Sequence, residues 1–201
     1  MRRMTWMAAG LAAALLLCLL AGCRTETEKT ALTEGELDEL STWLSQPGVC
    51  ELFRSGFNKG EEVDLSDMFY DGAGLDLGEL TQEERDALAG PGAEPGLDVI
   101  KVTVEQVRGL VAERLGVEKV SVDWLRAKMA DWIYLAQFDA FYHIHGDTLM
   151  RNVTCDSGTW EADGSLLVDC RCSDLEIGRV VRLYPKEGGG YRIGYIRAPG
   201  G

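Results

Sequence analysis

The amino-acid sequence predicts an α+β fold, with N-terminal helices packed on a C-terminal antiparallel β-meander of about four strands. Apolar residues recur at helical spacing through the first two thirds of the chain, and they alternate with polar residues after Gly146. The alternating runs are short and are separated by turn residues. Helices first and consecutive strands last is the order typical of an α+β domain whose helices cover one face of a sheet.

Capping boxes mark the starts of three predicted helices. In each box a Thr is followed three residues later by Glu or Gln, so that side chains satisfy the free N–H groups of a helix start. The boxes span residues 33–36, 81–84 and 103–106. Pro47-Gly48, Gly90 and Gly116 are the matching stop signals. A further short helix is expected over 64–70.

Between Ser121 and about Tyr142 the chain is rich in aromatic residues. Four positions of this segment follow helical spacing, namely Leu125, Met129, Trp132 and Ala136. The segment therefore predicts a central helix buried on the sheet.

The last third of the chain predicts two β-hairpins. In the first, the runs Leu149–Cys155 and Leu166–Cys172 flank turn residues at 161–164. In the second, Val180–Tyr184 and Tyr191–Arg197 flank three consecutive glycines. These four runs are the strands of the predicted meander.

Residues 32–201 are expected to form a single α+β domain. Such a length, about 170 residues, can bury on the order of 70% of the surface of the unfolded chain. The Gly- and Pro-rich stretch 90–96 is a possible boundary between two lobes, but each lobe would be marginal alone.

The N-terminal segment has the features of a secretory signal. Two arginines precede an uncharged stretch rich in Ala and Leu, which ends in the residues Leu20-Ala21-Gly22-Cys23. This ending resembles the lipobox of bacterial lipoproteins, an apolar residue and two small ones before a Cys. The alternative is an uncleaved transmembrane helix, because the uncharged run approaches the ~20 residues needed to span a bilayer.

The lipobox resemblance implies that the thiol of Cys23 receives a diacylglyceryl group and that the chain is cut just before it. Residues 1–22 are then a signal peptide and residues 23–31 a lipidated tether. The resemblance places the protein on the extracytoplasmic face of the bacterial cell membrane, held there by lipid.

The charge balance is acidic and uneven. The net charge is −13, and removal of the signal with its two arginines makes it −15. All of this excess lies between Arg24 and Thr148, because the chain from Leu149 onward has seven residues of each sign. The balance argues against a nucleic-acid partner, which needs a basic surface. It favours cations or basic partners, or reflects solvated helix faces alone.

Four cysteines remain in the predicted domain as disulfide candidates: Cys50, Cys155, Cys170 and Cys172. A two-residue turn at 163–164 would place Cys155 opposite Cys172, whereas a four-residue loop at 161–164 would place it opposite Cys170. We expect at least one disulfide involving Cys155, and the cysteine left over is available to Cys50. The alternative is four buried free thiols.

Both histidines of the chain lie in one cluster, made of His143, His145 and Asp147. Imidazoles and a carboxylate are usual metal ligands, and alternate residues of an extended segment share a face, so the three can converge on a metal ion. On a helix, His145 would point away from the other two. The alternative is a surface turn capped by Asp147, with no metal, and no other cofactor is expected.

The segment around this cluster also resembles one found in uncharacterised lipoproteins of Gram-positive gut bacteria. The residues that carry this resemblance are Asp131-Trp132-Ile133-Tyr134, Phe141-Tyr142-His143 and His145-Gly146-Asp147-Thr148. It implies an extracytoplasmic location and no known activity.

The sequence contains no complete catalytic set, so the expected function is non-enzymatic. We expect a membrane-anchored binding or accessory domain whose ligand is a protein, a peptide or a wall component. A metal-binding protein or metal-dependent enzyme that uses the histidine cluster is the alternative.

Overall fold

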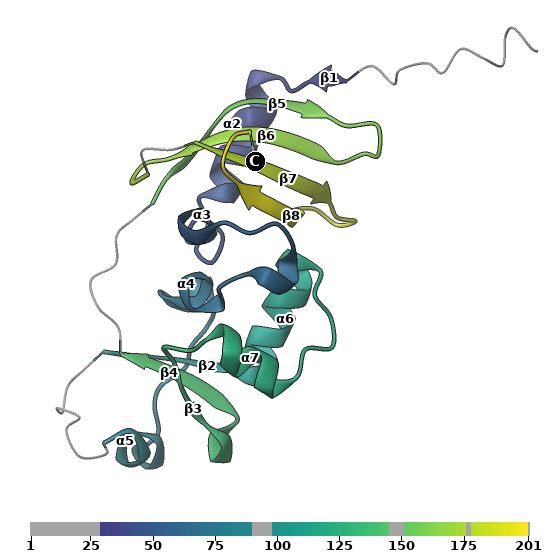
Figure 1. Cartoon of the computed structure of the whole chain (residues 1–201). Coiled ribbons are helices and arrows are strands. Elements are labelled where there is room, and N and C mark those ends of the chain that lie inside the picture. Colours follow the sequence, from purple (N-terminus) through teal and green to yellow (C-terminus); the bar gives the residue numbers. More distant parts are fainter. Residues whose placement is uncertain (1–28, 90–97, 145–150, 176–177, 201) are drawn as a thin grey trace, which may run out of the picture.

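The computed structural model describes residues 29–89, 98–144, 151–175 and 178–200 (Figure 1). The predicted signal peptide, the predicted lipidation site Cys23, the possible boundary at 90–96 and the residues His145 and Asp147 lie outside the described residues. None of the helices in the described ranges combines the length and the apolar character needed to cross a bilayer.

The C-terminal meander is present, as the sequence predicts. Four consecutive strands pair antiparallel, and a short N-terminal strand adds a fifth at the edge, in the order β1-β5-β6-β7-β8. The strands are β1 (Thr30–Ala31), β5 (Val153–Trp160), β6 (Leu166–Cys172), β7 (Arg179–Pro185) and β8 (Tyr191–Arg197). The α+β class predicted from the pattern of helices and strands is therefore confirmed.

Helices precede the meander and pack against it. The α-helices are α2 (Glu34–Leu44), α3 (Leu52–Ser55), α4 (Leu65–Phe69), α5 (Gln82–Leu88), α6 (Val104–Leu115) and α7 (Val122–Lys128). Short 3-10 turns lie at η1 (Gly60–Glu62), η2 (Gly72–Gly74) and η3 (Ala136–Phe138). All three predicted capping boxes form, at the starts of α2, α5 and α6. The short helix expected over 64–70 is α4, capped by Asp64.

Helix α2 binds the edge of β5 through side chains. The hydroxyl of Ser41 accepts the backbone N–H of Cys155 at 2.9 Å, and that of Ser45 accepts the N–H of Val153 at 2.9 Å. Strand β1 pairs only with the far end of β5, at Thr159 and Trp160. The two serines therefore satisfy donors that an unpaired strand edge would otherwise leave exposed.

The aromatic segment is not one central helix, so that prediction is wrong. Helix α7 ends at Lys128, and the chain continues as β3 (Ile133–Leu135) and β4 (Ala140–Ile144), with a left-handed turn at Asp139 between them. The apparent helical spacing has a local cause, because Leu125, Met129 and Trp132 are all buried along the last turn of α7 and the turn after it.

A second sheet results, which the sequence did not predict. Strand β4 pairs antiparallel with β3 and also with β2 (Val99–Thr103), giving the order β2-β4-β3. Strand β2 alternates between half-buried and buried positions, and its buried residues are Ile100 and Val102. We call β2, β3, β4 and α5 the distal lobe, because they lie at the opposite end of the view from β1 (Figure 1).

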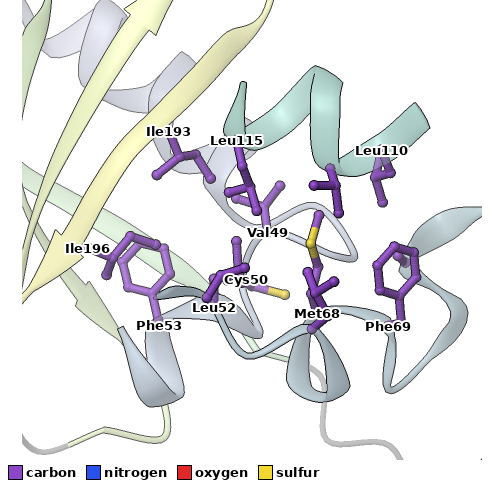
Figure 2. Close-up of a cluster of buried hydrophobic side chains, with 14 of the residues drawn as sticks. Val49, Cys50, Leu52, Phe53, Met68, Phe69, Leu110, Leu115, Ile193 and Ile196 are labelled. Atoms are coloured by element: carbon purple, nitrogen blue, oxygen red, sulfur yellow. The ribbon is translucent and has the colours of Figure 1, made fainter. Parts of the chain in front are cut away.

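The core joins the helices to both sheets. Phe53 of α3, Met68 of α4 and Leu115 of α6 converge with Ile193 and Ile196 of β8 (Figure 2). These side chains belong to one buried hydrophobic cluster that also includes Ile100 and Val102 of the second sheet. Each of the two sheets thus has one face buried in this cluster and one face turned away from it.

Candidate functional site

The described part of the chain begins a short distance after the predicted lipid attachment site. Lys29 follows Cys23 by six residues and forms an ion pair with Glu161 at 3.1 Å. Strand β1 then pairs with β5. Any attachment at Cys23 is therefore connected directly to the β1 edge of the five-stranded sheet.

Two of the candidate disulfide partners face each other across neighbouring strands. Cys155 of β5 is opposite Cys170 of β6, and their sulfur atoms lie 3.6 Å apart. The structure has this register because Trp160 pairs with Leu166 and a bulge follows at Asp156. The four-residue loop expected for this register is thus replaced by a five-residue loop and a bulge.

All four described cysteines are buried free thiols in the structure. The contact between Cys155 and Cys170 lowers the pKa of the first and raises the pKa of the second. At 3.6 Å the two sulfurs are not bonded, since a disulfide requires about 2.05 Å. A disulfide involving Cys155 stays a prediction.

The other two thiols each donate to a carboxylate. Cys50 donates to Glu51 at 2.9 Å, and Cys172 donates to Asp174 at 3.0 Å. Burial and the neighbouring carboxylate raise both pKa values, that of Cys172 to about 11. The charge of Arg151 lowers the pKa of both thiols, but by less than burial and the carboxylates raise it. Both are protonated at neutral pH, so neither is poised as a nucleophile.

His143 lies in an aromatic stack on the inner side of the distal sheet. Its ring is 5.1 Å from that of Trp132, nearly parallel to it, and 5.4 Å from that of Tyr70. The indole N–H of Trp132 is buried and has no partner among the described residues. In those same residues no three His, Cys, Asp or Glu side chains are grouped as metal ligands. Metal binding by this cluster stays a prediction.

The outer face of the distal sheet has a different character. Alternation along the strands places Ile133, Tyr142 and Ile144 on this side, opposite His143. Val99 and Lys101 of β2 share it. We call these five residues the distal face. Ile133 is 45% exposed and Ile144 is 48% exposed, although both are large apolar side chains.

A buried ion pair lies in the middle of the distal face. Glu84 of α5 accepts from the ammonium of Lys101 at 2.6 Å and from the hydroxyl of Tyr142 at 2.6 Å. Burial opposes the charge of Glu84, but the bonds from Lys101, Tyr142 and Thr81 outweigh it and lower its pKa to about 2. The sequence predicts Glu84 only as a capping-box residue, because its second role depends on the distal sheet, which the sequence does not predict.

Strands β2 and β3 form the edges of the distal sheet. Among the described residues, each of them pairs with β4 alone. An edge strand presents backbone donors and acceptors to which a further extended segment can pair. The distal face thus combines exposed apolar side chains, an ion pair and free strand edges.

A shallow hollow of about 560 Å³ lies beside α6, against the turn that leads to α7. Its charged lining mixes Glu105, Glu118 and Asp139 with Arg108 and Lys119. The mixture leaves no strong field of one sign, so the hollow does not select an anion or a cation.

Comparisons of the chain with models of known protein families, with curated proteins and with solved structures find no match.

Proposed function

We propose that the protein is a lipid-anchored extracytoplasmic domain with a binding or accessory role and no catalytic activity of its own. The observation that carries the proposal is the lipobox-like sequence Leu20-Ala21-Gly22-Cys23, whose Cys lies six residues before Lys29, the first described residue. Two or three acyl chains on one residue hold a protein stably at a bilayer, at roughly 0.8 kcal/mol per buried CH₂. The short spacing keeps the domain close to that bilayer.

The distal face is the proposed contact surface for the ligand, which is a protein, a peptide or a wall component. Ile133 and Ile144 offer apolar area, and the free edges of β2 and β3 offer backbone hydrogen bonds. Together they suit an extended peptide segment that adds to a sheet edge. Anchoring raises the local concentration of such a binder, so a modest affinity is sufficient.

Metabolic labelling with palmitate tests the anchor. The wild-type protein is expected to take up label, and Cys23→Ala is expected to lose both the label and its fractionation with membranes. Cys18→Ala is the matched control, because it removes the other cysteine of the signal region and should keep the label. Equal labelling of the Cys23→Ala protein, or no label on any of the three, contradicts the proposal.

Photocrosslinking at the cell surface tests the contact surface. A photoreactive residue at position 133 or 144 is expected to capture the same partner, identified by mass spectrometry. Position 187, an exposed glutamate in the β7–β8 turn, is the control. Capture of the same species from position 187, or of different species from 133 and 144, contradicts a specific distal contact.

A further inference from the structure

Strands β7 and β8 carry a second distinctive surface, on the side of the five-stranded sheet opposite its buried face; at the β8 edge the side chain of Arg192 also reaches Gly116, the residue that ends α6. Their inward residues, including Val181, Leu183, Ile193 and Ile196, are buried in the core. Alternation places the remaining side chains on the opposite side. We call five of these the arginine–tyrosine face: Arg182, Tyr184, Arg192, Tyr195 and Arg197.

The arginines of this face lie over the tyrosine rings. The guanidinium carbon of Arg197 is 4.0 Å from the ring centre of Tyr195, and that of Arg192 is 4.8 Å from the ring centre of Tyr184. Gly194 makes room for Tyr184, because a Cβ there would come within 2.7 Å of the ring. The contacts hold the charged groups against the sheet while leaving Arg192 exposed.

The charged residues of strands β7 and β8 are all basic, although the same side of the neighbouring strand β6 carries the exposed Asp169. The two strands contain four arginines and no Asp or Glu. Arg182 is paired with Asp163 at 2.8 Å. Within the described ranges, Arg192 and Arg197 form no ion pair, so their charges are available to an anionic ligand. The rest of the molecule is very different, since the net charge of −15 lies entirely between residues 24 and 148.

The number of residues between Cys23 and strand β1 limits how far the five-stranded sheet can lie from the membrane. Six residues reach at most about 20 Å when fully extended. Four strand spacings, the width from β1 to β8, are about 19 Å. An anchor at Cys23 therefore allows the whole five-stranded sheet to lie along the bilayer, with the distal lobe at the far end (Figure 1).

We propose that the arginine–tyrosine face rests on the anionic phospholipid headgroups of the membrane that holds the anchor, and so orients the domain. This inference rests on the lipid anchor proposed above. Arginine and tyrosine suit a membrane interface, because each combines an apolar body with a polar end. An anionic surface attracts Arg192 and Arg197 and repels the acidic remainder of the chain.

The test uses the protein purified from membranes and reconstituted in two kinds of vesicle. One is pure phosphatidylcholine, and the other is an equal mixture of phosphatidylcholine and phosphatidylglycerol. Flotation reports attachment, and the rate of modification by phenylglyoxal at each arginine, followed by mass spectrometry, reports orientation. Arg85 and Arg126 are matched controls, because both are exposed and lie away from the proposed face.

Modification of Arg192 and Arg197 is expected to be about fivefold slower on the anionic vesicles, given the attraction of one basic residue to such a surface. The rates at Arg85 and Arg126 should not change. The difference should disappear at about 1 M salt, where the screening length falls to about 3 Å.

Each result of this experiment decides between the anchor and the orientation. Flotation with both vesicles and equal rates at Arg192 and Arg197 overturns the orientation and leaves the anchor standing. Flotation with anionic vesicles alone, with slowed modification, supports the face and overturns the anchor. Flotation with neither overturns both. Slowing at Arg85 and Arg126 as well, or protection by purified wall polymer in place of the anionic vesicles, overturns the assignment to lipid.

Discussion

The two sheets of this protein bury one face each and use the other face in opposite ways. The five-stranded sheet presents arginines on tyrosine rings, in a part of the chain whose charges balance. The distal sheet presents isoleucines around a buried Glu84–Lys101 pair, in the part that carries all of the excess negative charge. The same architecture thus supplies two surfaces with different chemistry at the two ends of one molecule. The proposed membrane contact and the proposed partner contact therefore use different residues.

The two sheets are expected to differ most in how much unfolding free energy is lost when the acidic partner of an ion pair is removed. Glu84→Ala leaves Lys101 and the Tyr142 hydroxyl without their partner inside the protein, and should cost about 3 kcal/mol of unfolding free energy. Asp156→Ala removes the exposed partner of Arg171 in the five-stranded sheet, and should cost under about 1 kcal/mol. Urea unfolding of both variants measures the difference, and equal losses contradict it.

Oxidation of Cys155 and Cys170 should stabilise the five-stranded sheet alone. The reaction removes two thiol protons and two electrons, which an extracytoplasmic thiol oxidant accepts. Closing a loop of this size contributes about 3 kcal/mol. Peptide mapping without reductant is expected to find Cys155 joined to Cys170, and Cys50→Ser should leave that link intact. Alkylation of Cys155 and Cys170 in the unreduced protein argues against the link.

Acid should weaken the distal lobe through Glu84. Its pKa is lowered from the ordinary 4.5 to about 2, so its contribution to stability is complete above 4.5 and is lost as the pH falls toward 2. The difference in unfolding free energy between wild type and Glu84→Gln should therefore shrink as the pH falls from 6 to 3. A difference that stays constant over this range shows that ionisation of Glu84 does not stabilise the fold.

The smallest effect is expected at His143. His143→Ala removes a ring stacked on Trp132 and should cost about 1 kcal/mol. Metal analysis of the purified protein should find well under one equivalent of zinc, both in the wild type and in His143→Ala and His145→Ala. One equivalent in the wild type that is lost in both variants establishes the metal site instead, and makes the distal lobe a metal centre.

The two sheets also differ in how far the sequence predicts them. The strands of the meander are neighbours in the chain, and each carries its own alternation, so local pattern was sufficient. Strand β2 pairs with β4 some forty residues later, and helices α6 and α7, strand β3 and the turn η3 lie between them. The end of α7 imitates a longer helix because Trp132 remains buried after the helix has stopped. Ala140–Ile144 is recognised as a strand only from its pairing with β2, and no local sequence pattern indicates that pairing.

The candidate sites follow the same division. The register that places Cys155 opposite Cys170 was one of two expected from turn length, and the bulge at Asp156 is what the sequence did not reveal. The alternation of residues in the last two strands indicates the arginine–tyrosine face. That this side is the outer one depends on the core, which buries the opposite side of the two strands. The Glu84–Lys101–Tyr142 contact joins three distant positions, and nothing in their spacing indicates it.

Strand β1 has a mechanical consequence. Any tension applied through a lipid at Cys23 reaches first Lys29, which is paired with Glu161, and then the two-residue strand Thr30–Ala31 at the edge of β5. The two residue pairs of this strand separate one after the other, and they do so before the force reaches α2. A force from shear flow or from a crowded wall would thus lengthen the tether by a few residues. The core, the arginine–tyrosine face and the distal face would stay as they are.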